Sequence, residues 1–437
     1  MHTGAHSEAS IWASAETLPR EPLEALQLER LRETIGRVLR RQPPGAERLA
    51  AAGVSRTADI RSLDDLRQIP FATKADLRTH YPFGLLTVPR EQLVRVHASS
   101  GTHGKPTVVG YTRTDLENWT ELMARCMTMA GVRPGMVIHN ANGYGLFTGG
   151  FGFHQGGERI GATVVPVSGG FTARQAVLLR DLGANVLVST PSYALAIAQA
   201  LHDGGEEAST PTLELGLFGG EPWSEGMRVE IERALGLQAV SFYGLSEMCG
   251  PGVAAECLVA RAGLHVQEDH FLVEVVDPSD GRRLAAGAEG ELVFTTLTKE
   301  ALPLIRYRTG DIGRVSEEPC ECGRTMVRLT GLRGRHDDML IVRGVNVFPS
   351  QIEELILRCK GLAPHYEIEI TRPNRLDEIS IVVEGRPELS DNARQAEGLL
   401  LAAKLKDNIG ISADIRVAAS GSLPRSAGKA LHVKDRR

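Results

Sequence analysis

The chain has 437 residues, of which 42% are hydrophobic and 24% charged, a composition typical of a globular protein with room for more than one core. A formal net charge of −5 and an aromatic content of 5% argue against a basic, base-stacking surface for nucleic acid. No apolar run reaches the length of a membrane span, and the first residues lack the regions of a signal peptide. We therefore expect a cytoplasmic protein that binds neither nucleic acid nor a membrane.

The first predicted elements alternate between helices and strands. An amphipathic helix is predicted over 21–41, where leucine and isoleucine recur at helical spacing. A second helix is predicted over 113–130, with a capping box from Thr114 to Glu117. Short apolar runs typical of strands stand at 135–140, 161–167, 185–190 and 213–220. This alternation predicts an α/β domain with parallel-rich sheets.

The pattern changes twice further along the chain. Near residue 270 it favours consecutive strands, which predicts a β-rich subdomain. From about residue 334 the order is helix, two strands, helix and strand, with a first helix at 350–359 capped by Ser350 and Glu353. We predict a large N-terminal domain over 1–333 and a small α+β C-terminal domain over 334–437.

The stretch "HASSGTHGKPT" at 97–107 is rich in hydroxyl groups and glycine. It differs from the P-loop of nucleoside triphosphatases, because the gap between Gly101 and Gly104 is too short and Pro106 disfavours a helical start at Lys105. We interpret it as a turn between strands whose hydroxyls, amides and lysine hold polyphosphate. A polar surface loop is the alternative that this stretch leaves open by itself.

Further motifs follow in a fixed order. They are "SFYGLSEM" (241–248), "IRYRTGDIG" (305–313), "GRHDDMLIVRGVNVFPSQIEE" (334–354) and "LPRSAGKA" (423–430). With the Ser/Gly loop they resemble the motifs of the adenylate-forming enzymes. "NGYGLFTGGFGFHQGG", "FGGEPWS" and "YGLSEMCGPGVAAEC" resemble the phenylacetate–CoA ligase branch of that superfamily, and the resemblance extends from about residue 10 to the end of the chain.

The resemblance implies an enzyme that works in two steps. An aryl acid reacts with ATP to give an acyl-adenylate, and the thiol of coenzyme A then takes the acyl group. It also implies a large adenylation domain, a mobile C-terminal domain, Mg²⁺ as a cofactor and a homodimer. Because a carboxylate is already ionised at neutral pH, the first step needs charge neutralisation and alignment rather than a general base.

The resemblance also implies a role in ATP binding for each of these motifs. The Ser/Gly loop would hold the β and γ phosphates, with His103 where relatives usually carry a second threonine. Tyr243 would stack on adenine, Glu247 would bind Mg²⁺, and Asp311 would accept hydrogen bonds from the ribose. Without the motifs, Tyr243 would be interpreted as a core tyrosine and Asp311 as a turn residue. The full expected set is Ser99, Ser100, Gly101, Thr102, Gly104, Lys105, Glu221, Pro222, Tyr243, Gly244, Asp311 and Arg335.

The resemblance assigns catalysis and domain movement to the C-terminal part. Lys429 would bridge the substrate carboxylate and the α-phosphate, although by composition alone it would be interpreted as a solvated lysine. Asp337 would be the hinge about which the small domain rotates. Gly344 would lie beside the tunnel for coenzyme A, where the lack of a side chain permits close approach.

For the acyl group, the resemblance implies a pocket of aromatic residues and glycine. The expected residues are Tyr144, Phe147, Gly219, Gly220 and Pro251. Relatives often have alanine where this chain has Gly220, which predicts a slightly larger pocket and permits a substituted aryl acid.

Four residues with metal-binding side chains stand apart from these motifs. Cys257 precedes His265, and Cys320 and Cys322 follow in C-x-C spacing. A Cys₃His set suits a tetrahedral structural Zn²⁺ with no open position for catalysis. Reduced thiols beside a chance histidine are the alternative.

Two functions compete with the ligase hypothesis. An aryl-acid adenylating enzyme of the benzoate or anthranilate type would share every adenylation residue but pass the acyl group to a carrier protein or another acceptor. A non-enzymatic ATP-binding protein with this fold would have no need for Lys429, Glu247 and Asp311 together.

Overall fold

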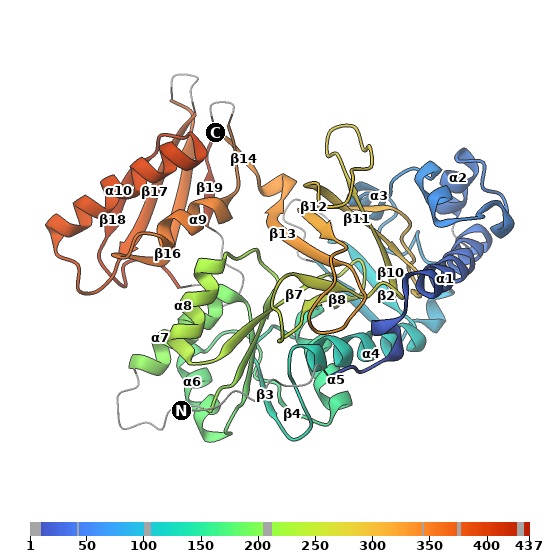
Figure 1. Cartoon of the computed structure of the whole chain (residues 1–437), viewed down its shortest axis with the longest axis horizontal. Coiled ribbons are helices and arrows are strands. Elements are labelled where there is room, and N and C mark those ends of the chain that lie inside the picture. The colour runs from blue at the N-terminus through green and yellow to red at the C-terminus, as the bar shows by residue number, and fades with distance from the viewer. Residues whose placement is uncertain are drawn as a thin grey trace.

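The computed structural model describes residues 10–41, 43–99, 106–203, 212–342, 345–373, 377–425 and 432–437. Figure 1 shows two unequal parts side by side, a large N-terminal one and a small one, coloured orange to red, that ends at the C-terminus. The predicted α/β class with a smaller C-terminal domain is confirmed.

The N-terminal segment is helical and packs on one end of the large part (Figure 1). Leu31, Ile35 and Val38 of its long helix are buried against Leu297 and Ile305. Their three- and four-residue spacing gives the helix one apolar face, which confirms the helix predicted over 21–41. The helices of this segment are α1 (Arg20–Arg41), α2 (Pro43–Ala51) and α3 (Lys74–Thr79), with short 3₁₀ helices at Ser14–Thr17, Thr57–Asp59, Leu63–Gln68 and Arg90–Gln92.

Eleven strands within the described residues form one mixed sheet. They are β3 (Val137–Asn140), β4 (Thr163–Val165), β5 (Val186–Ser189), β6 (Leu215–Gly219), β7 (Gln238–Leu245), β8 (Gly250–Glu256), β9 (Leu264–Val266), β10 (Phe271–Val276), β11 (Gly290–Thr296), β12 (Tyr307–Ser316) and β13 (Arg328–Arg335). Their order is β10-β11-β12-β13-β9-β8-β7-β6-β5-β3-β4. Pairing is parallel from β4 to β7 and antiparallel from β7 onwards, so the β-rich half begins about twenty residues earlier than the predicted change near 270.

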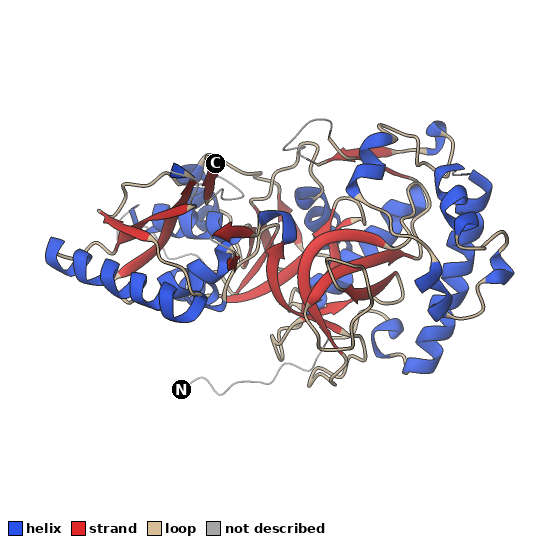
Figure 2. Ribbon diagram, turned by 90° about the horizontal axis from the view of Figure 1, so that it is seen from above, coloured by secondary structure: helices blue, strands red, loops and turns tan. Residues whose placement is uncertain are grey.

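Helices cover both faces of the parallel half (Figure 2). Val186 and Val188 of β5 belong to the core that contains the buried residues of α4 and α5, whereas Leu187 packs with residues of the helices on the opposite face. Side chains of a strand alternate between faces, so a strand buried on both sides is apolar throughout. These helices are α4 (Arg113–Met129), α5 (Gly149–Ile160), α6 (Thr172–Asp181), α7 (Pro191–Asp203) and α8 (Glu225–Leu235). Within the described ranges, no helix combines the length and the apolar character that crossing a membrane requires.

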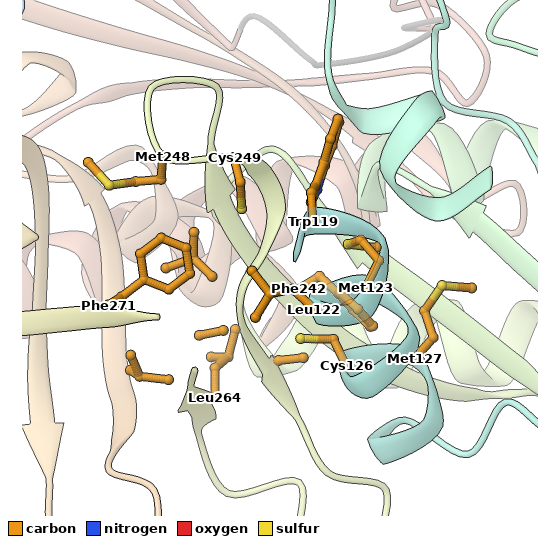
Figure 3. Close-up of a cluster of buried hydrophobic side chains, with 14 of the residues drawn as sticks. Trp119, Leu122, Met123, Cys126, Met127, Phe242, Met248, Cys249, Leu264 and Phe271 are labelled. Carbon is orange, nitrogen blue, oxygen red and sulfur yellow. The ribbon is translucent and has the colours of Figure 1, made fainter. Parts of the chain in front are cut away.

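The buried face of α4 follows a helical period that is visible in the sequence. Figure 3 shows its buried face, which presents Trp119, Leu122, Met123, Cys126 and Met127 to the core at three- and four-residue spacing. This spacing is visible in the sequence, and the helix predicted over 113–130 is confirmed.

Its cap, however, differs from the prediction. Thr112 Oγ1 accepts a hydrogen bond from Asp115 N (3.1 Å), and Asp115 Oδ2 accepts one from Thr112 N (3.0 Å). The capping box predicted for Thr114 and Glu117 is therefore wrong by two residues. Asp115 also accepts a hydrogen bond from the backbone N of Glu300 (2.6 Å), a distant contact that a local pattern cannot reveal.

The small part has its own core and follows the predicted order of helix, two strands, helix and strand. Ile352 and Ile356 of its first helix, Ile368 of the central strand and Leu401 of the second helix are fully buried together. Its elements are α9 (Pro349–Leu357), β16 (Leu362–Thr371), β17 (Glu378–Gly385), α10 (Asp391–Ile409), β18 (Asp414–Ala418) and β19 (Val433–Asp435). The sheet order is β18-β17-β16-β19, and the sequence did not predict β19. A two-stranded ribbon, β14 (Leu340–Val342) and β15 (Val345–Val347), and the 3₁₀ helix His336–Asp338 precede this domain.

The start of α9 also corrects a prediction. Phe348 is its N-cap, and Gln351 Oε1 accepts a hydrogen bond from Phe348 N (2.9 Å). The predicted capping box of Ser350 with Glu353 is wrong, because Ser350 Oγ donates to the carbonyl of Arg333 (2.7 Å) and Glu353 faces the large domain. The boundary predicted at residue 333 lies inside β13, which continues the large sheet to Arg335.

Candidate active site

The predicted phosphate loop connects two short antiparallel strands. β1 (Arg95–Ala98) precedes it and β2 (Val108–Tyr111) follows it. Ser99 N donates to Thr107 O (2.9 Å), and Thr107 N donates to Ser99 Oγ (3.3 Å), so the strands stay paired up to the loop. Ser100, Gly101, Thr102, His103, Gly104 and Lys105 lie outside the described residues.

Three motifs far apart in the sequence meet at the end of β7. Tyr243 Oη donates a hydrogen bond of 2.6 Å to Asp311 Oδ2 in β12. Asp311 is in turn the register partner of Arg335 in β13. The predicted adenine, ribose and phosphate residues thus lie on neighbouring parts of one sheet. The sequence did not predict the hydrogen bond between Tyr243 and Asp311.

Glu247 occupies the tight turn between β7 and β8. Its carboxylate is buried and accepts a hydrogen bond from Tyr307 Oη (3.4 Å). A Cβ at Gly244 would lie 2.0 Å from the carbonyl oxygen of Gly250, so this turn requires glycine. The close approach of the two strands explains why Gly244 belongs to the motif.

The two phenols of this region are held in their neutral form. Burial, followed by the carboxylate of Asp311, raises the pKa of Tyr243 well above its ordinary value. Burial, followed by the carboxylate of Glu247, does the same for Tyr307. Both side chains therefore remain hydrogen-bond donors to the two carboxylates that are expected to bind ribose and Mg²⁺.

A second turn, after β6, carries Glu221 and Pro222. Gly220 adopts a left-handed conformation (φ 84°), and a Cβ at Gly219 would lie 2.4 Å from the carbonyl oxygen of Phe242. Backbone geometry thus gives a reason for both glycines in addition to the pocket expected from the resemblance. Glu221 Oε1 accepts a hydrogen bond from Ser192 N (2.7 Å), which fixes this turn to the start of α7.

Three of the residues expected around the acyl group, Tyr144, Phe147 and Pro251, lie near the start of α5, whereas Gly219 and Gly220 belong to the turn after β6. Tyr144 is half-buried, and its hydroxyl accepts from Asn140 Nδ2 (2.8 Å) and lies 3.1 Å from His154 Nδ1. Burial raises the pKa of Tyr144 to about 12. Phe147 is exposed, whereas the carbonyl of Pro251 accepts a hydrogen bond from Trp119 Nε1 (2.8 Å).

A buried lysine supports the turn that carries Glu247, and the sequence reasoning missed it. Lys299 Nζ donates to the carbonyl of Met248 (2.7 Å) and lies 4.0 Å from the centre of the Tyr111 ring. Tyr111 Oη donates to the carbonyls of Ser246 (3.3 Å) and Cys249 (3.2 Å). Figure 3 shows Met248 and Cys249 above the core of α4. A single lysine in "TLTKEAL" carries no local signal of this role.

The described residues on either side of the predicted catalytic lysine are firmly held. Glu384 accepts two hydrogen bonds from Arg425 (2.8 Å each) and one each from the backbone N of Leu423 (2.7 Å) and Gly421 (3.0 Å). Burial alone would raise the pKa of Glu384, but these hydrogen bonds outweigh it and the pKa is lowered. On the other side, the ring of His432 stacks on Tyr366 with centroids 4.1 Å apart.

The predicted catalytic lysine, coenzyme A contact and hinge all belong to the C-terminal part of the chain. Lys429 and Gly344 lie outside the described residues. Asp337 belongs to the 3₁₀ helix His336–Asp338, which follows the last strand of the large sheet. The hinge, the catalytic lysine and the coenzyme A contact stay predictions.

The four predicted metal ligands come together in space. Their donor atoms, Sγ of Cys257, Cys320 and Cys322 and a ring nitrogen of His265, all lie within 4.8 Å of one another. Cys257 Sγ is 3.7 Å from Cys320 Sγ, and Cys322 Sγ is 3.5 Å from His265 Nε2. Thiolates bound to tetrahedral zinc at about 2.3 Å stand about 3.8 Å apart, so the donor set fits the ion.

Comparison with known proteins identifies the family. Residues 23–297 match the family model described as AMP-binding enzyme, and residues 344–437 match the one described as AMP-binding enzyme C-terminal domain. The chain belongs to the AMP-binding enzyme family. Phenylacetate-coenzyme A ligases of Thermus thermophilus and Escherichia coli are each 50% identical to this AMP-binding enzyme, over 94% and 97% of its chain and 96% and 97% of theirs. That of Pseudomonas putida is 46% identical, over 97% of this chain and 96% of its own.

Solved structures of one relative distinguish two domain arrangements. A 2-hydroxyisobutyryl-CoA ligase in the postadenylation state, in complex with 2-HIB-AMP, is 29% identical and matches with a TM-score of 0.91 over 97% of this chain and 91% of its own. The same ligase in the thioesterification state, with 2-HIB-AMP and CoA, matches with a TM-score of 0.71 over 96% and 91%. The domain arrangement of this AMP-binding enzyme is therefore more similar to the postadenylation state.

Proposed function

We propose that the protein is an ATP-dependent phenylacetate–CoA ligase that releases AMP and pyrophosphate. The observation that carries the proposal is the identity of 45–50% to phenylacetate-coenzyme A ligases across nearly the whole of both chains. The convergence of Tyr243, Asp311 and Arg335 on one sheet supports it, because these residues are the expected contacts to adenosine.

The proposed reaction needs two bond changes at the acyl group. In the first, a carboxylate oxygen bonds to the α-phosphorus of ATP, and pyrophosphate leaves with the electrons of the broken P–O bond. In the second, the sulfur of coenzyme A bonds to the acyl carbon, AMP leaves with the electrons of the C–O bond, and the thiol proton passes to solvent. Both steps depend on alignment and on stabilising anionic oxygens.

Each candidate residue has a role in this proposal. The Ser/Gly loop and Lys429 would neutralise phosphate charge, and Glu247 would hold Mg²⁺, since its carboxylate is an oxygen donor fixed in a tight turn. Asp311 would accept hydrogen bonds from the ribose. Tyr144, Phe147, Gly219, Gly220 and Pro251 would line the site of the aryl ring.

We also propose that Cys257, His265, Cys320 and Cys322 hold one structural zinc ion. The support is the approach of all four donor atoms to within 4.8 Å, from residues that two loops and a strand contribute. Four protein ligands leave no open position, so the ion would stabilise the fold without taking part in the reaction. A homodimer and a cytoplasmic location stay predictions from the sequence.

Two measurements test the proposed ligase activity. ATP–pyrophosphate exchange would be measured with phenylacetate, benzoate, anthranilate and an aliphatic acid, and AMP release would then be measured with and without coenzyme A. We expect exchange with phenylacetate and AMP release that depends on coenzyme A. Exchange with another acid alone, or release that ignores coenzyme A, would instead favour an adenylating enzyme with a different substrate or acceptor. The absence of exchange with every acid would contradict the enzymatic proposal.

A further inference from the structure

A buried carboxylate lies in the seam between the two domains. Glu353 of α9 is only 4% exposed. Its Oε1 accepts hydrogen bonds from Oγ (2.8 Å) and N (3.2 Å) of Ser224, the residue of the large domain that caps α8. Its Oε2 accepts a hydrogen bond from Tyr366 Oη (3.3 Å) in the small domain. The carboxylate therefore connects the N-terminus of α8 to the core of the small domain.

The rest of the seam is narrow. A Cβ at Gly226 would lie 3.0 Å from Leu357 Cβ, so α8 and α9 approach closely at one point. Arg386 pairs with Glu230 of α8 at 2.6 Å, and this pair lies nearer to solvent than Glu353. Figure 1 shows α9 beside α8 where the two parts meet. Of these two polar contacts, that of Glu353 with Ser224 is the more deeply buried.

The neighbouring glutamate in "QIEE" has a different environment. Glu354 points to the surface, where its side chain is 48% exposed and pairs with Arg358 of the same helix. A surface pair within one helix contributes little to how two domains are arranged. The two adjacent glutamates therefore provide a natural comparison, because only one of them contacts the large domain.

Glu353 receives its hydrogen bonds from Ser224 only where the two domains are in contact. Burial raises the pKa of Glu353, hydrogen bonds from Ser224 and the nearby His432 oppose that rise, and the carboxylate of Glu221 adds to it. A buried carboxylate is tolerated only where its hydrogen bonds are satisfied. If the seam opened, Glu353 would exchange its hydrogen bonds from Ser224 for water, and Ser224 would lose its acceptor.

The structure is more similar to the postadenylation state of 2-hydroxyisobutyryl-CoA ligase than to its thioesterification state, with TM-scores of 0.91 and 0.71. We propose that Glu353 is a positioning residue that, through its hydrogen bonds to Ser224, holds the small domain in the arrangement seen here. This inference rests on the proposed ligase function. It implies that Glu353 favours adenylate formation over thioester formation, although it contacts neither substrate.

The first experiment measures the domain arrangement without any substrate. Fluorescent amino acids replace the exposed Leu399 of α10 and the exposed Val177 of α6, and energy transfer between them reports the arrangement in single molecules. We expect Glu353→Ala to reduce the ratio of the present arrangement to others by about tenfold, since a hydrogen bond to a charged group contributes on this order. Ser224→Ala should reduce it similarly, and the double variant should add little more.

The matched control is Glu354→Ala, which should leave the energy-transfer distribution unchanged. An unchanged distribution in Glu353→Ala, an equal change in Glu354→Ala, or fully additive effects in the double variant would overturn the proposal. Thermal unfolding of each variant identifies any that fails to fold, and Ser224→Ala then provides the independent test of the same contact.

The second experiment separates the two half-reactions. We expect Glu353→Ala to slow ATP–pyrophosphate exchange while thioester formation from supplied phenylacetyl-adenylate is unchanged or faster. Equal loss of both half-reactions would point to a structural role and contradict the proposal. If wild-type protein shows no exchange with phenylacetate, the proposed function fails, but the energy-transfer result still decides the role of Glu353.

Discussion

Asp311 contacts Tyr243 through a short side-chain hydrogen bond. Its carboxylate oxygen Oδ2 accepts a hydrogen bond of 2.6 Å from the Tyr243 hydroxyl. The hydrogen bond orients the carboxylate, and it holds the ring of Tyr243 about 5.9 Å from that of Phe294. One contact therefore positions the two residues expected to bind opposite ends of adenosine.

We predict that Asp311→Ala lowers kcat/KM for ATP by about 10- to 100-fold, because it removes charged hydrogen bonds to the ribose. Tyr243→Phe should have a smaller effect, because it removes only the hydroxyl that orients Asp311. Steady-state kinetics with varied ATP measure both, and Asp280→Ala on the exposed surface is the control. An unchanged kcat/KM for ATP in Asp311→Ala would contradict the assigned role.

The buried Lys299 predicts a pH dependence of stability. Burial lowers the pKa of Lys299 from 10.5 to about 8, and the charge of Asp115 opposes this effect. Between these two pH values the folded protein releases a proton that the unfolded chain keeps. The contribution of Lys299 to the free energy of unfolding therefore increases as pH rises through this range and decreases as pH falls.

We therefore expect the free energy of unfolding of the wild type, relative to Lys299→Met, to increase as pH rises from about 8 to about 10. Chemical denaturation at several pH values measures this difference, because most other titrating groups are common to both proteins. The exposed Lys406→Met should show no such trend. A difference that is constant with pH would mean that Lys299 keeps an ordinary pKa in the folded state.

At the scale of elements, the four proposed zinc ligands come from segments that lie far apart in the sequence. Cys257 follows β8, His265 lies in β9, and Cys320 and Cys322 lie between β12 and β13. A zinc ion bound here would hold the segment after β8 and the loop between β12 and β13 against β9. Local sequence indicated the residue types, whereas only the pairing of β9 with β13 brings the pairs together.

The zinc proposal predicts one equivalent of zinc in the purified protein and its loss in Cys320→Ser, with a lower thermal unfolding temperature. Metal analysis and calorimetry provide the two measurements. Cys359→Ser, a buried cysteine of the small domain, should keep the zinc. A native protein that is free of metal and as stable as the zinc-loaded form would refute the site.

At the scale of the whole molecule, two domains with separate cores meet in a narrow seam. Such interfaces permit rearrangement, because few buried contacts must be exchanged. The proposed mechanism requires this, since Lys429 belongs to the small domain while Glu247 and Asp311 belong to the large one. The roles predicted for Lys429 and Glu353 therefore both depend on how the two domains are arranged.

We predict that Lys429→Ala reduces adenylate formation by at least about a hundredfold, as expected when a charge that stabilises the transition state is removed. Thioester formation from supplied phenylacetyl-adenylate should remain close to that of the wild type. Lys434→Ala, which removes a surface ion pair with Glu367, is the control. Equal loss of both half-reactions would exclude the role assigned to Lys429.

Local patterns predicted the helices and the fold class well. The reason is that the buried face of a helix or strand requires apolar residues at the period of that element. The apolar face of α4 and the continuous apolar run of β5 are examples, and both are decided by which side chains must leave water. The caps were predicted less well. Thr112 rather than Thr114 caps α4, and Asp115, its partner in the cap, also accepts a hydrogen bond from the distant backbone N of Glu300.

By itself, the sequence determined the family and the candidate residues, because motif order and residue type record the chemistry that the chain can perform. Tertiary structure alone decided which of these residues touch. It placed Tyr243 against Asp311, Lys299 beneath the turn of Glu247, and Glu353 in the seam instead of in a helix cap. The physical reason is that hydrogen bonds between distant segments depend on how the sheet and the two domains pack, and that packing leaves no periodic signal in the sequence.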